Sequence, residues 1–479
     1  MSGWNGIHGW NEECGVMGVV GVGNAAEIAA LGLHALQHRG QEATGVVACD
    51  DQGTFRVAKG IGLVADVYRG DTLATLAGSL AIGHNRYSTA GGLTLENTQP
   101  LRVVYRGGPL ALAHNGNLTN ARVVRQGLEE SGSIFQTTLD TEIFLHLLAL
   151  AATDDVEEAL TEAARQVEGA YSLVVLTRES VIALRDPHGF RPLCIGRLGD
   201  GYVVASETCA LDLVGADFLR EVLPGEMVTI DPHGMRTRQA LAPAGAPQHC
   251  IFEHIYFSRP DSRVFGDSVD AVRRRLGHRL AAEHPADADL VIAVPDSSNS
   301  IALGFSEASG LRYELALIRN HYVGRTFIQP QQAGRDFGVR VKFNPVREIL
   351  DGKRVVVVDD SIVRGTTSRK LVRLLRRAGA REVHFRVGSP PVTHPCFYGI
   401  DTPSRRELIG ALKSVDEIRE YLGVESLGYL SLAGLLACEK EPRYYCRACF
   451  TGQYPVEVDP QASKLVLEQP RRAPAPNGG

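Results

Sequence analysis

The chain of 479 residues contains no long hydrophobic run and no excess of positive charge. No stretch approaches the ~20 apolar residues that a membrane span needs, so we expect no membrane-spanning segment. Residues 1–13 contain neither Lys nor Arg and no apolar run, so they do not resemble a secretory signal. With a formal net charge of −5 and a pI near 6.3, nothing indicates binding to nucleic acid or to an anionic membrane. Any basic site for phosphate groups must therefore be local.

Cysteine is scarce as well, with nine residues in the whole chain. An odd number in a long chain argues against a disulfide framework and favours a reducing compartment, so we expect a cytoplasmic location. The hydrophobic content of 44% and the charged content of 22% are typical of a soluble globular protein. The length suggests about two or three domains.

Strand-like and helical patterns are clustered in the first half of the chain, which favours an α+β layered domain. The Pro- and Ala-rich stretch 241–248 is typical of a linker, and we place the domain boundary there. The predicted parts are a leading segment over residues 1–13, a first domain over 14–245, a second over 246–458, and a disordered tail over 459–479. The patterns in the first domain predict strands at 16–22, 44–48, 171–176, 181–184 and 202–205, and helices at 24–37 and 142–152.

The second half repeats a strand–loop–helix pattern, which indicates a parallel α/β sheet whose ligands bind beyond the carboxyl ends of the strands. The apolar run 290–294 leads into Pro295-Asp296-Ser297-Ser298, and the run 354–358 leads into Asp359-Asp360. Adjacent buried carboxylates repel each other, and a divalent cation or vicinal hydroxyls would compensate them. The following Gly365-Thr366-Thr367 offers backbone N–H groups at a helix start, which favour an anion. The plainer alternative is a strand that ends in Asp before an N-capped helix.

The run from Asp359 to Ser368 resembles the phosphoribosylpyrophosphate (PRPP) motif of type I phosphoribosyltransferases. The resemblance implies that Asp359 and Asp360 meet the ribose hydroxyls, that the turn holds the 5′-phosphate, and that Ser297 helps these aspartates to bind Mg²⁺. Residues 320–327, running on to Lys342, resemble the lid that closes over PRPP, although alone they would be interpreted as a basic surface loop. The implied PRPP-binding residues are Asp359, Asp360, Ser361, Arg364, Gly365, Thr366, Thr367, Asp296, Ser298, Arg325 and Lys342.

Cys14 lies close to the start of the chain, in Glu13-Cys14-Gly15. Removal of residues 1–13 would make it an N-terminal cysteine that carries both a nucleophilic thiol and an α-amine titrating near ~7.7–8.0. Such a pair suits attack on a carboxamide. The alternative is an ordinary buried cysteine, which is the commoner role of this residue type.

The first half resembles the glutaminase domain of amidotransferases with an N-terminal nucleophile, through the motifs around Cys14, His38-Arg39-Gly40, His84-Asn85-Arg86, His114-Asn115-Gly116 and Asp140-Thr141-Glu142. The Asn115 side chain and the Gly116 N–H could stabilise an oxyanion. Arg86 could bind the α-carboxylate of glutamine, Asp140 its α-ammonium, and Arg39 is a further candidate. Alone, Asn115-Gly116 would suggest a hairpin turn, and Arg86 and Asp140 would suggest surface charge or a helix cap.

Together the halves resemble the amidophosphoribosyltransferase family over nearly the whole chain. The fold implied is an αββα glutaminase domain followed by a type I phosphoribosyltransferase domain with a parallel sheet. The reaction implied is glutamine + PRPP + water to 5-phosphoribosylamine + glutamate + pyrophosphate, the first step of purine synthesis, with ammonia passed internally to ribose C1. The resemblance also implies homotetramers and feedback inhibition by purine nucleotides. The alternatives are another amidotransferase of this class, such as glucosamine-6-phosphate synthase, and a non-catalytic PRPP-responsive regulator.

Cys446-Arg447-Ala448-Cys449 is a C-x-x-C pair, for which zinc is the first interpretation and a redox dithiol the second. No second C-x-x-C exists, so a metal needs two remote ligands. Cys250 and Cys396 match the remaining ligands of the iron–sulfur subgroup of the family, which implies a [4Fe–4S] cluster and a cleaved propeptide. We interpret Cys49, Cys194, Cys209 and Cys438 as core or surface thiols.

Overall fold

The structure is a computed structural model that describes residues 14–87, 92–320, 342–458 and 467. The predicted propeptide, Arg325 and nearly all of the predicted tail lie outside these residues. The chain forms two compact units. Of the described residues, one unit comprises 14–247, Phe397–Ile400, 456–458 and 467, and we call it the glutaminase unit after the resemblance of its motifs. The other, called the transferase unit for the same reason, runs from Gln248 to Cys396 and again from Asp401 to Pro455.

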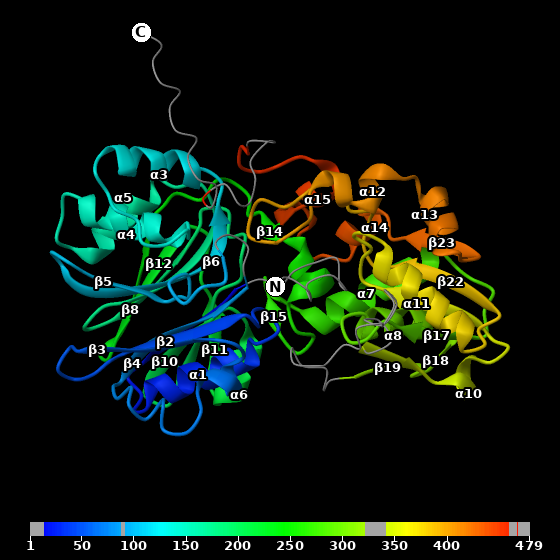
Figure 1. The fold of residues 1–479 in the computed structure, drawn as a ribbon, viewed down its shortest axis with the longest axis horizontal. Helices are drawn as coiled ribbons and strands as arrows, with labels where there is room; N and C mark the ends of the chain where they lie inside the picture. The colour runs from blue at the N-terminus through cyan, green and yellow to red at the C-terminus, as the bar shows by residue number, and fades with distance from the viewer. Residues whose placement is uncertain (1–13, 88–91, 321–341, 459–466, 468–479) are drawn as a thin grey trace, which may run out of the picture. The chain divides into compact units, whose positions relative to one another are not determined.

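The glutaminase unit contains two antiparallel sheets, one on the other, with helices outside each of them (Figure 1). The seven-stranded sheet has the order β11 (Asp217–Glu221), β9 (Cys194–Leu198), β10 (Gly201–Ala205), β1 (Gly15–Val20), β4 (Leu80–Arg86), β2 (Ala43–Cys49), β3 (Phe55–Ile61). The six-stranded sheet has the order β13 (Gly234–Gln239), β12 (Glu226–Asp231), β8 (Val181–Arg185), β7 (Gly169–Leu176), β6 (Gly108–Leu118), β5 (Leu101–Tyr105). The outer helices are α1 (Ala25–Ala35), α2 (Val64–Val67) and α6 (Thr208–Val214) on the first sheet, and α3 (Ala121–Glu130), α4 (Thr141–Leu150) and α5 (Val156–Ala164) on the second.

Alternation of side chains along the strands builds these layers. On β1, Val16 and Val20 belong to the core between the sheets, whereas Met17 and Val19 pack against α1. On β6, Ala111 belongs to the same inner core and Leu112 to the core under α4. The predicted αββα architecture is therefore confirmed.

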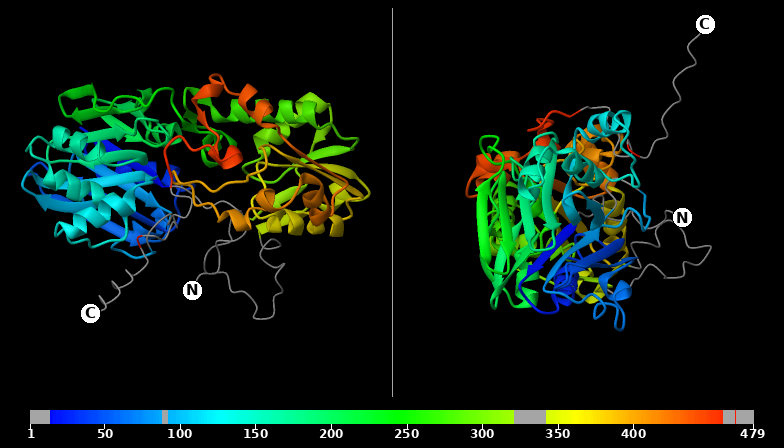
Figure 2. Two further views of the ribbon diagram at one scale, coloured as in Figure 1. Left: turned by 90° about the horizontal axis from the view of Figure 1, so that it is seen from above. Right: turned by 90° about the vertical axis from the view of Figure 1, so that its left-hand side faces the viewer.

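The transferase unit is built on a five-stranded parallel sheet with helices on both faces (Figure 2). Its order is β18 (Arg312–Tyr313), β17 (Leu290–Ala293), β21 (Arg354–Asp359), β22 (Glu382–Val387), β23 (Ser426–Tyr429). Helices α11 (Thr366–Arg377) and α13 (Val415–Leu422) pack against one face through Leu371, Leu375 and Ile418. Helices α7 (Val269–Glu283) and α8 (Asn299–Ser309) lie on the other, so the predicted parallel sheet is confirmed.

The shorter elements of this unit include a parallel pair of strands, β14 (His249–Cys250) and β24 (Tyr445–Cys446). The others are η1 (Glu253–Phe257), β15 (Arg263–Val264), β16 (Asp267–Ser268), β19 (Leu317–Arg319), β20 (Phe343–Pro345), α10 (Arg347–Leu350), η2 (Arg405–Glu407), α12 (Ile409–Leu412), α14 (Leu432–Ala437), η3 (Pro442–Tyr444) and α15 (Ala448–Thr451). Within the ranges that the structure describes, no helix is both long and apolar enough to span a bilayer.

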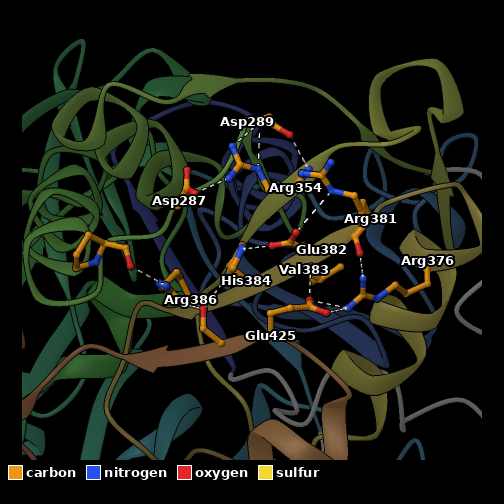
Figure 3. A network of polar contacts seen from close by, with 12 residues as sticks. Asp287, Asp289, Arg354, Arg376, Arg381, Glu382, Val383, His384, Arg386 and Glu425 are labelled. Atoms are coloured by element: carbon orange, nitrogen blue, oxygen red, sulfur yellow. Dashed lines mark hydrogen bonds and ion pairs between the residues drawn. The ribbon is translucent and has the colours of Figure 1, made fainter.

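The amino ends of the parallel strands carry a network of paired charges (Figure 3). Arg354, at the start of β21, donates to Asp287 at 2.5 Å and to Asp289 at 2.9 Å. Arg376 donates to both carboxylate oxygens of Glu425, which also accepts from the backbone N–H of Val383. Each carboxylate of this network therefore has a guanidinium partner.

Candidate functional site

Cys14 lies directly before β1 and is buried, with 9% of its surface exposed. Its Sγ lies 3.7 Å from the backbone oxygen of Tyr87. On the β1–β4 ladder Gly15 pairs with Asn85, so one further step brings Arg86 opposite Cys14. By strand alternation Cys14 shares the side of Val16, which faces the space between the two sheets.

Asn115 and Gly116 lie within β6 and pair with Ser172 and Tyr171 of β7, so the hairpin-turn alternative is wrong. Asn115 follows Ala111 and Ala113 on the side of β6 that faces the first sheet, and it is buried. Its Nδ2 has no hydrogen-bond partner among the described residues. Because a buried donor without an acceptor is costly, this amide is well suited to an oxygen that arrives with a ligand.

Gly116 has a φ of 150°, and a Cβ built there would lie 2.0 Å from the backbone oxygen of Ala170. Glycine is therefore required at this position by both conformation and space. Its backbone N–H is the second donor that the sequence assigned to an oxyanion.

Arg86 and Asp140 are both buried, so the interpretation as surface charge is wrong. Arg86 donates to the backbone oxygens of Asn97 and Gly92. Asp140 occupies the N-cap position of α4, but its carboxylate accepts from the backbone N–H of Leu118 at 2.9 Å. Burial alone would raise the pKa of Asp140, but the nearby His114 and the backbone donors lower it below its ordinary value. The group is therefore an anion, as recognition of an ammonium requires.

The described contacts of Arg39 are with Cys14 and with a residue that sequence reasoning missed, Glu207. Arg39 is fully buried, donates from Nε to the backbone oxygen of Cys14 at 3.2 Å, and forms a 2.5 Å ion pair with Glu207. Glu207 lies far along the chain, in Ser206-Glu207-Thr208, which resembles no motif that the sequence analysis used. Binding of glutamine by Arg39 stays a prediction.

The two aspartates of the transferase unit lie at the carboxyl end of β21, as predicted, and α11 starts at Thr366 after Gly365. Ser297, from the loop after β17, donates to Asp360 at 2.5 Å. Ser298 lies 3.4 Å from both carboxylates. The structure therefore brings together the loops that follow two neighbouring strands.

Both of these carboxyl groups have raised pKa values. Burial, and then the negative charge of Asp360, raises the pKa of Asp359 well above its ordinary value. Burial also raises the pKa of Asp360, although hydrogen bonds from Ser297 and Ser361 and the charge of the buried Arg273 oppose the shift. Arg273 is a second residue that the sequence analysis missed. Burial and mutual repulsion thus disfavour the charged form of this pair, and a bound cation would relieve both effects.

Several of the remaining predicted PRPP residues lie in the described part of the chain and have contacts of their own. Arg364 forms an ion pair with Glu407 at 2.9 Å, and Asp296 forms one with Arg319 at 2.7 Å. Gly365 has a φ of 71° and is buried, whereas Thr366 is exposed and Thr367 half-buried. The backbone oxygen of Lys342 accepts from Asn320, and the predicted lid between them lies outside the described residues.

Comparison with known proteins decides between the alternatives that the sequence left open. Residues 84–213 match the glutamine amidotransferase domain, and residues 303–388 match the phosphoribosyl transferase domain. Amidophosphoribosyltransferase 2 of Arabidopsis thaliana, named as chloroplastic, is 53% identical over 93% of this chain and 80% of its own length. The amidophosphoribosyltransferase of Bacillus subtilis is 51% identical over 94% of this chain and 96% of its own length. The chain belongs to the amidophosphoribosyltransferase family.

Two solved structures resemble this chain over nearly its whole length. A structure of the allosteric regulatory enzyme of purine biosynthesis has a TM-score of 0.91 at 48% identity and covers 96% of this chain and 99% of its own. The Bacillus subtilis glutamine PRPP amidotransferase in complex with ADP and GMP has a TM-score of 0.90 at 49% identity and covers 95% and 100%. The predicted fold class and the predicted glutamine-dependent transferase activity, which opens purine biosynthesis, are therefore confirmed. Neither a non-catalytic regulator nor glucosamine-6-phosphate synthase is supported.

The predicted cluster cysteines of this chain are all buried and lie in the transferase unit. Cys250 and Cys446 are direct neighbours on the parallel strands β14 and β24. Burial raises the pKa of Cys449 well above its ordinary value, and the charges of Cys446, Cys250 and Cys396 raise it further. Among the residues that the structure describes, however, no group of three or more His, Cys, Asp or Glu side chains could hold a metal ion as it stands.

Proposed function

We propose that Cys14, once residues 1–13 have been removed, is the nucleophile of the glutaminase reaction. The thiolate attacks the side-chain carbonyl carbon of glutamine, and the oxyanion accepts hydrogen bonds from Asn115 Nδ2 and the Gly116 N–H. The C–N bond then breaks, a proton goes to the leaving nitrogen, and ammonia departs from a γ-glutamyl thioester. Water hydrolyses the thioester to glutamate and restores the thiol.

The observation that carries this proposal is the buried amide of Asn115. Cys14 shares the side of Val16 at the start of β1, and Asn115 shares the side of Ala111 and Ala113 on β6. Both of these sides face the space between the two sheets. The Nδ2 group has no acceptor among the described residues, and a single oxyanion donor is worth roughly 3–4 kcal/mol in a transition state. Arg86 would bind the α-carboxylate of glutamine, and the anionic Asp140 would bind its α-ammonium.

We further propose that Ser297, Asp359 and Asp360 hold Mg²⁺ together with PRPP. The raised pKa values of the two aspartates support this, because a divalent cation would compensate their loss of hydration and the repulsion between them. When bound, the ion would neutralise charge that develops on the departing pyrophosphate. Ser361, Arg364, Gly365, Thr366 and Thr367 would receive the 5′-phosphate, and Asp296, Ser298, Arg325 and Lys342 would approach the pyrophosphate. Ammonia from Cys14 would attack ribose C1.

For Cys250, Cys396, Cys446 and Cys449 we propose a [4Fe–4S] cluster rather than zinc. Four thiolates around one zinc ion, each at ~2.3 Å, must crowd together, whereas in a four-iron cluster each thiolate binds a different iron. The charges of Cys446, Cys250 and Cys396 act on Cys449, which supports these four thiols as one group of ligands. Anaerobic purification should yield a brown protein with about four iron and four sulfide per chain, and a colourless protein that contains zinc would contradict this assignment.

The propeptide, the homotetramer, inhibition by purine nucleotides and the cytoplasmic location belong to the same proposal. The relative in complex with ADP and GMP supports nucleotide binding by this family. N-terminal sequencing and intact mass would test removal of residues 1–13, and light scattering with and without GMP would test the assembly.

The nucleophile is tested with Cys14→Ala. Glutamine-dependent release of pyrophosphate should fall by at least ~1000-fold, because no thioester can form, while ammonia-dependent synthesis of phosphoribosylamine should continue unchanged. Cys49→Ala is the matched control, since burial and the neighbouring Asp50 raise the pKa of Cys49 to about 11 and make it inert. Retention of glutamine-dependent activity in Cys14→Ala would contradict the proposal.

A further inference from the structure

Glu207 is a fully buried carboxylate at the junction of two helices that cover the seven-stranded sheet. It occupies the N-cap position of α6, yet its side chain makes no capping hydrogen bond. Instead its Oε1 lies 2.5 Å from Arg39 Nη1 and 2.7 Å from His38 Nε2, two residues that follow the end of α1. Helices α1 and α6 lie side by side on the outer face of this sheet (Figure 1). The carboxylate thus holds the segment after one helix against the start of the other.

This ion pair continues to Cys14. Arg39 Nε donates to the backbone oxygen of Cys14 at 3.2 Å, while Arg39 Nη1 pairs with Glu207. The guanidinium is planar and rigid, so a carboxylate that fixes one of its edges also fixes the direction of its Nε–H. The position of the Cys14 carbonyl is therefore set through Arg39 by Glu207.

The residue before Glu207 holds the next part of the same strand. Ser206 Oγ accepts from the backbone N–H of Val16 at 3.0 Å, and the Ser206 N–H donates to the Val16 oxygen at 3.1 Å. These bonds extend the β1–β10 ladder, which pairs Met17 with Ala205, toward the start of β1. The dipeptide Ser206-Glu207 thus anchors both Val16 and, through Arg39, Cys14.

We propose that Glu207 is a positioning residue for the glutaminase reaction, which acts through Arg39 to hold Cys14 in place for attack. The inference rests on the proposed function of Cys14. After removal of the propeptide, Cys14 becomes a chain terminus, and termini fray unless they are tied down. Its carbonyl is the last backbone group before the strand begins, and the Glu207–Arg39 pair anchors it without occupying the thiol or the α-amine. Removal of this anchor would misplace the thiol relative to the donors on β6.

The test uses Glu207→Gln, which keeps the size of the side chain and removes its charge. The glutamine-dependent kcat should fall by ~10- to 100-fold with little change in the KM for glutamine, because the nucleophile and not the substrate pocket is displaced. The ammonia-dependent rate should stay at the wild-type value. Hydrogen exchange of the backbone amides of residues 15–17 should become faster, which reports loss of the anchor directly. Glu207→Asp, which restores the charge with a shorter side chain, should recover part of the rate.

The matched control is Glu226→Gln, which removes a buried carboxylate that pairs with Arg220 in the same unit. It should leave the glutamine-dependent kcat and the exchange at residues 15–17 unchanged. Rates are normalised to processed chain by intact mass, and if Glu207→Gln does not fold, Glu207→Asp carries the test.

A glutamine-dependent rate within about threefold of wild type in Glu207→Gln would overturn the inference, since misplacement of a catalytic group costs far more. A parallel loss of the ammonia-dependent rate would overturn it as well. These outcomes differ from failure of the proposed function, in which Cys14→Ala itself would retain glutamine-dependent activity.

Discussion

At the two ends of the five-stranded sheet in the transferase unit, pKa values of carboxylates are shifted in opposite directions. At the amino ends, Arg354 pairs with Asp289 and Asp287, and hydrogen bonds from Arg354 lower the pKa of Asp289 to about 2 (Figure 3). At the carboxyl ends, Asp359 and Asp360 face serine hydroxyls and each other, and burial raises both of their pKa values. The same strand, β21, begins at the first group and ends at the second.

This contrast distinguishes carboxylates that stabilise the fold from carboxylates that are suited to bind a ligand. A carboxylate that pairs with a guanidinium is satisfied within the chain, whereas two adjacent carboxylates whose pKa values are raised destabilise the fold until a ligand arrives. Parallel sheets bind ligands at their carboxyl ends, so unpaired charge at that end and paired charge at the other is the arrangement expected of a cation and phosphate site.

The sharpest test of the contrast is Asp359→Asn, which removes one charge of the adjacent pair and keeps the shape of the side chain. We expect the ammonia-dependent rate to fall by about 100-fold or more, because PRPP and its cation lose a ligand. The unliganded protein should gain about 2 °C in its midpoint of thermal unfolding, because the repulsion with Asp360 is relieved.

Asp289→Asn, at the other end of the sheet, is the matched control for Asp359→Asn. It should keep full activity and lose stability. If both substitutions lowered activity equally, the two ends would not differ in function.

The second prediction concerns pH. Because the folded-state pKa values of Asp359 and Asp360 are raised, the stability that they contribute is present at acid pH and is lost as the pH rises through those values. Binding of Mg²⁺ should offset this loss, so the increase in unfolding midpoint on addition of Mg²⁺ should grow from pH 5 to pH 8 by about 2 °C. Scanning calorimetry of wild type and of Asp359→Asn measures it. An equal Mg²⁺ effect at all pH values, or in both proteins, would count against these aspartates as the site.

The smallest effect is expected at the amino ends. Arg354→Leu removes the partner of two partly or fully exposed carboxylates, and such ion pairs contribute little. The unfolding midpoint should fall by about 1–2 °C in dilute buffer, and the difference should shrink at high salt because screening weakens the wild-type pair. Activity should not change. A loss that salt does not reduce would indicate that Arg354 acts through packing instead.

Sequence reasoning located the strands whose residues follow a regular apolar pattern. The run Val355–Val358 with Asp359-Asp360 and Gly365 after it defined β21 and the start of α11. The predicted helix at 142–152 corresponds to α4. In contrast, β4 and β6 were missed as strands, because their functional ends place polar residues such as His84, Asn85 and Asn115 at fully buried positions. Sites violate the local pattern that identifies a strand.

Sequence patterns also did not predict that Phe397–Ile400 belong to the glutaminase unit. There the backbone oxygen of Tyr398 accepts two hydrogen bonds from the buried Arg191, and its ring stacks on Phe190. No spacing or motif signals such a contact, because its partners lie about two hundred residues apart in the chain.

The sequence by itself identified the candidate functional groups of this protein. They are a cysteine before one strand, two adjacent aspartates at the end of another strand, and the motifs by which both halves resemble known enzymes. Each of these is a pattern of neighbouring residues, so it can be recognised without knowledge of the fold. Only the tertiary structure determined which residues position these functional groups. Arg39 links Glu207 to Cys14, the charge of Arg273 acts to lower the pKa of Asp360, and Asn115 lies in a strand with an amide donor that has no acceptor among the described residues. Such pairings depend on burial and on contacts between distant segments, and neither leaves a periodic or spaced signal in the sequence.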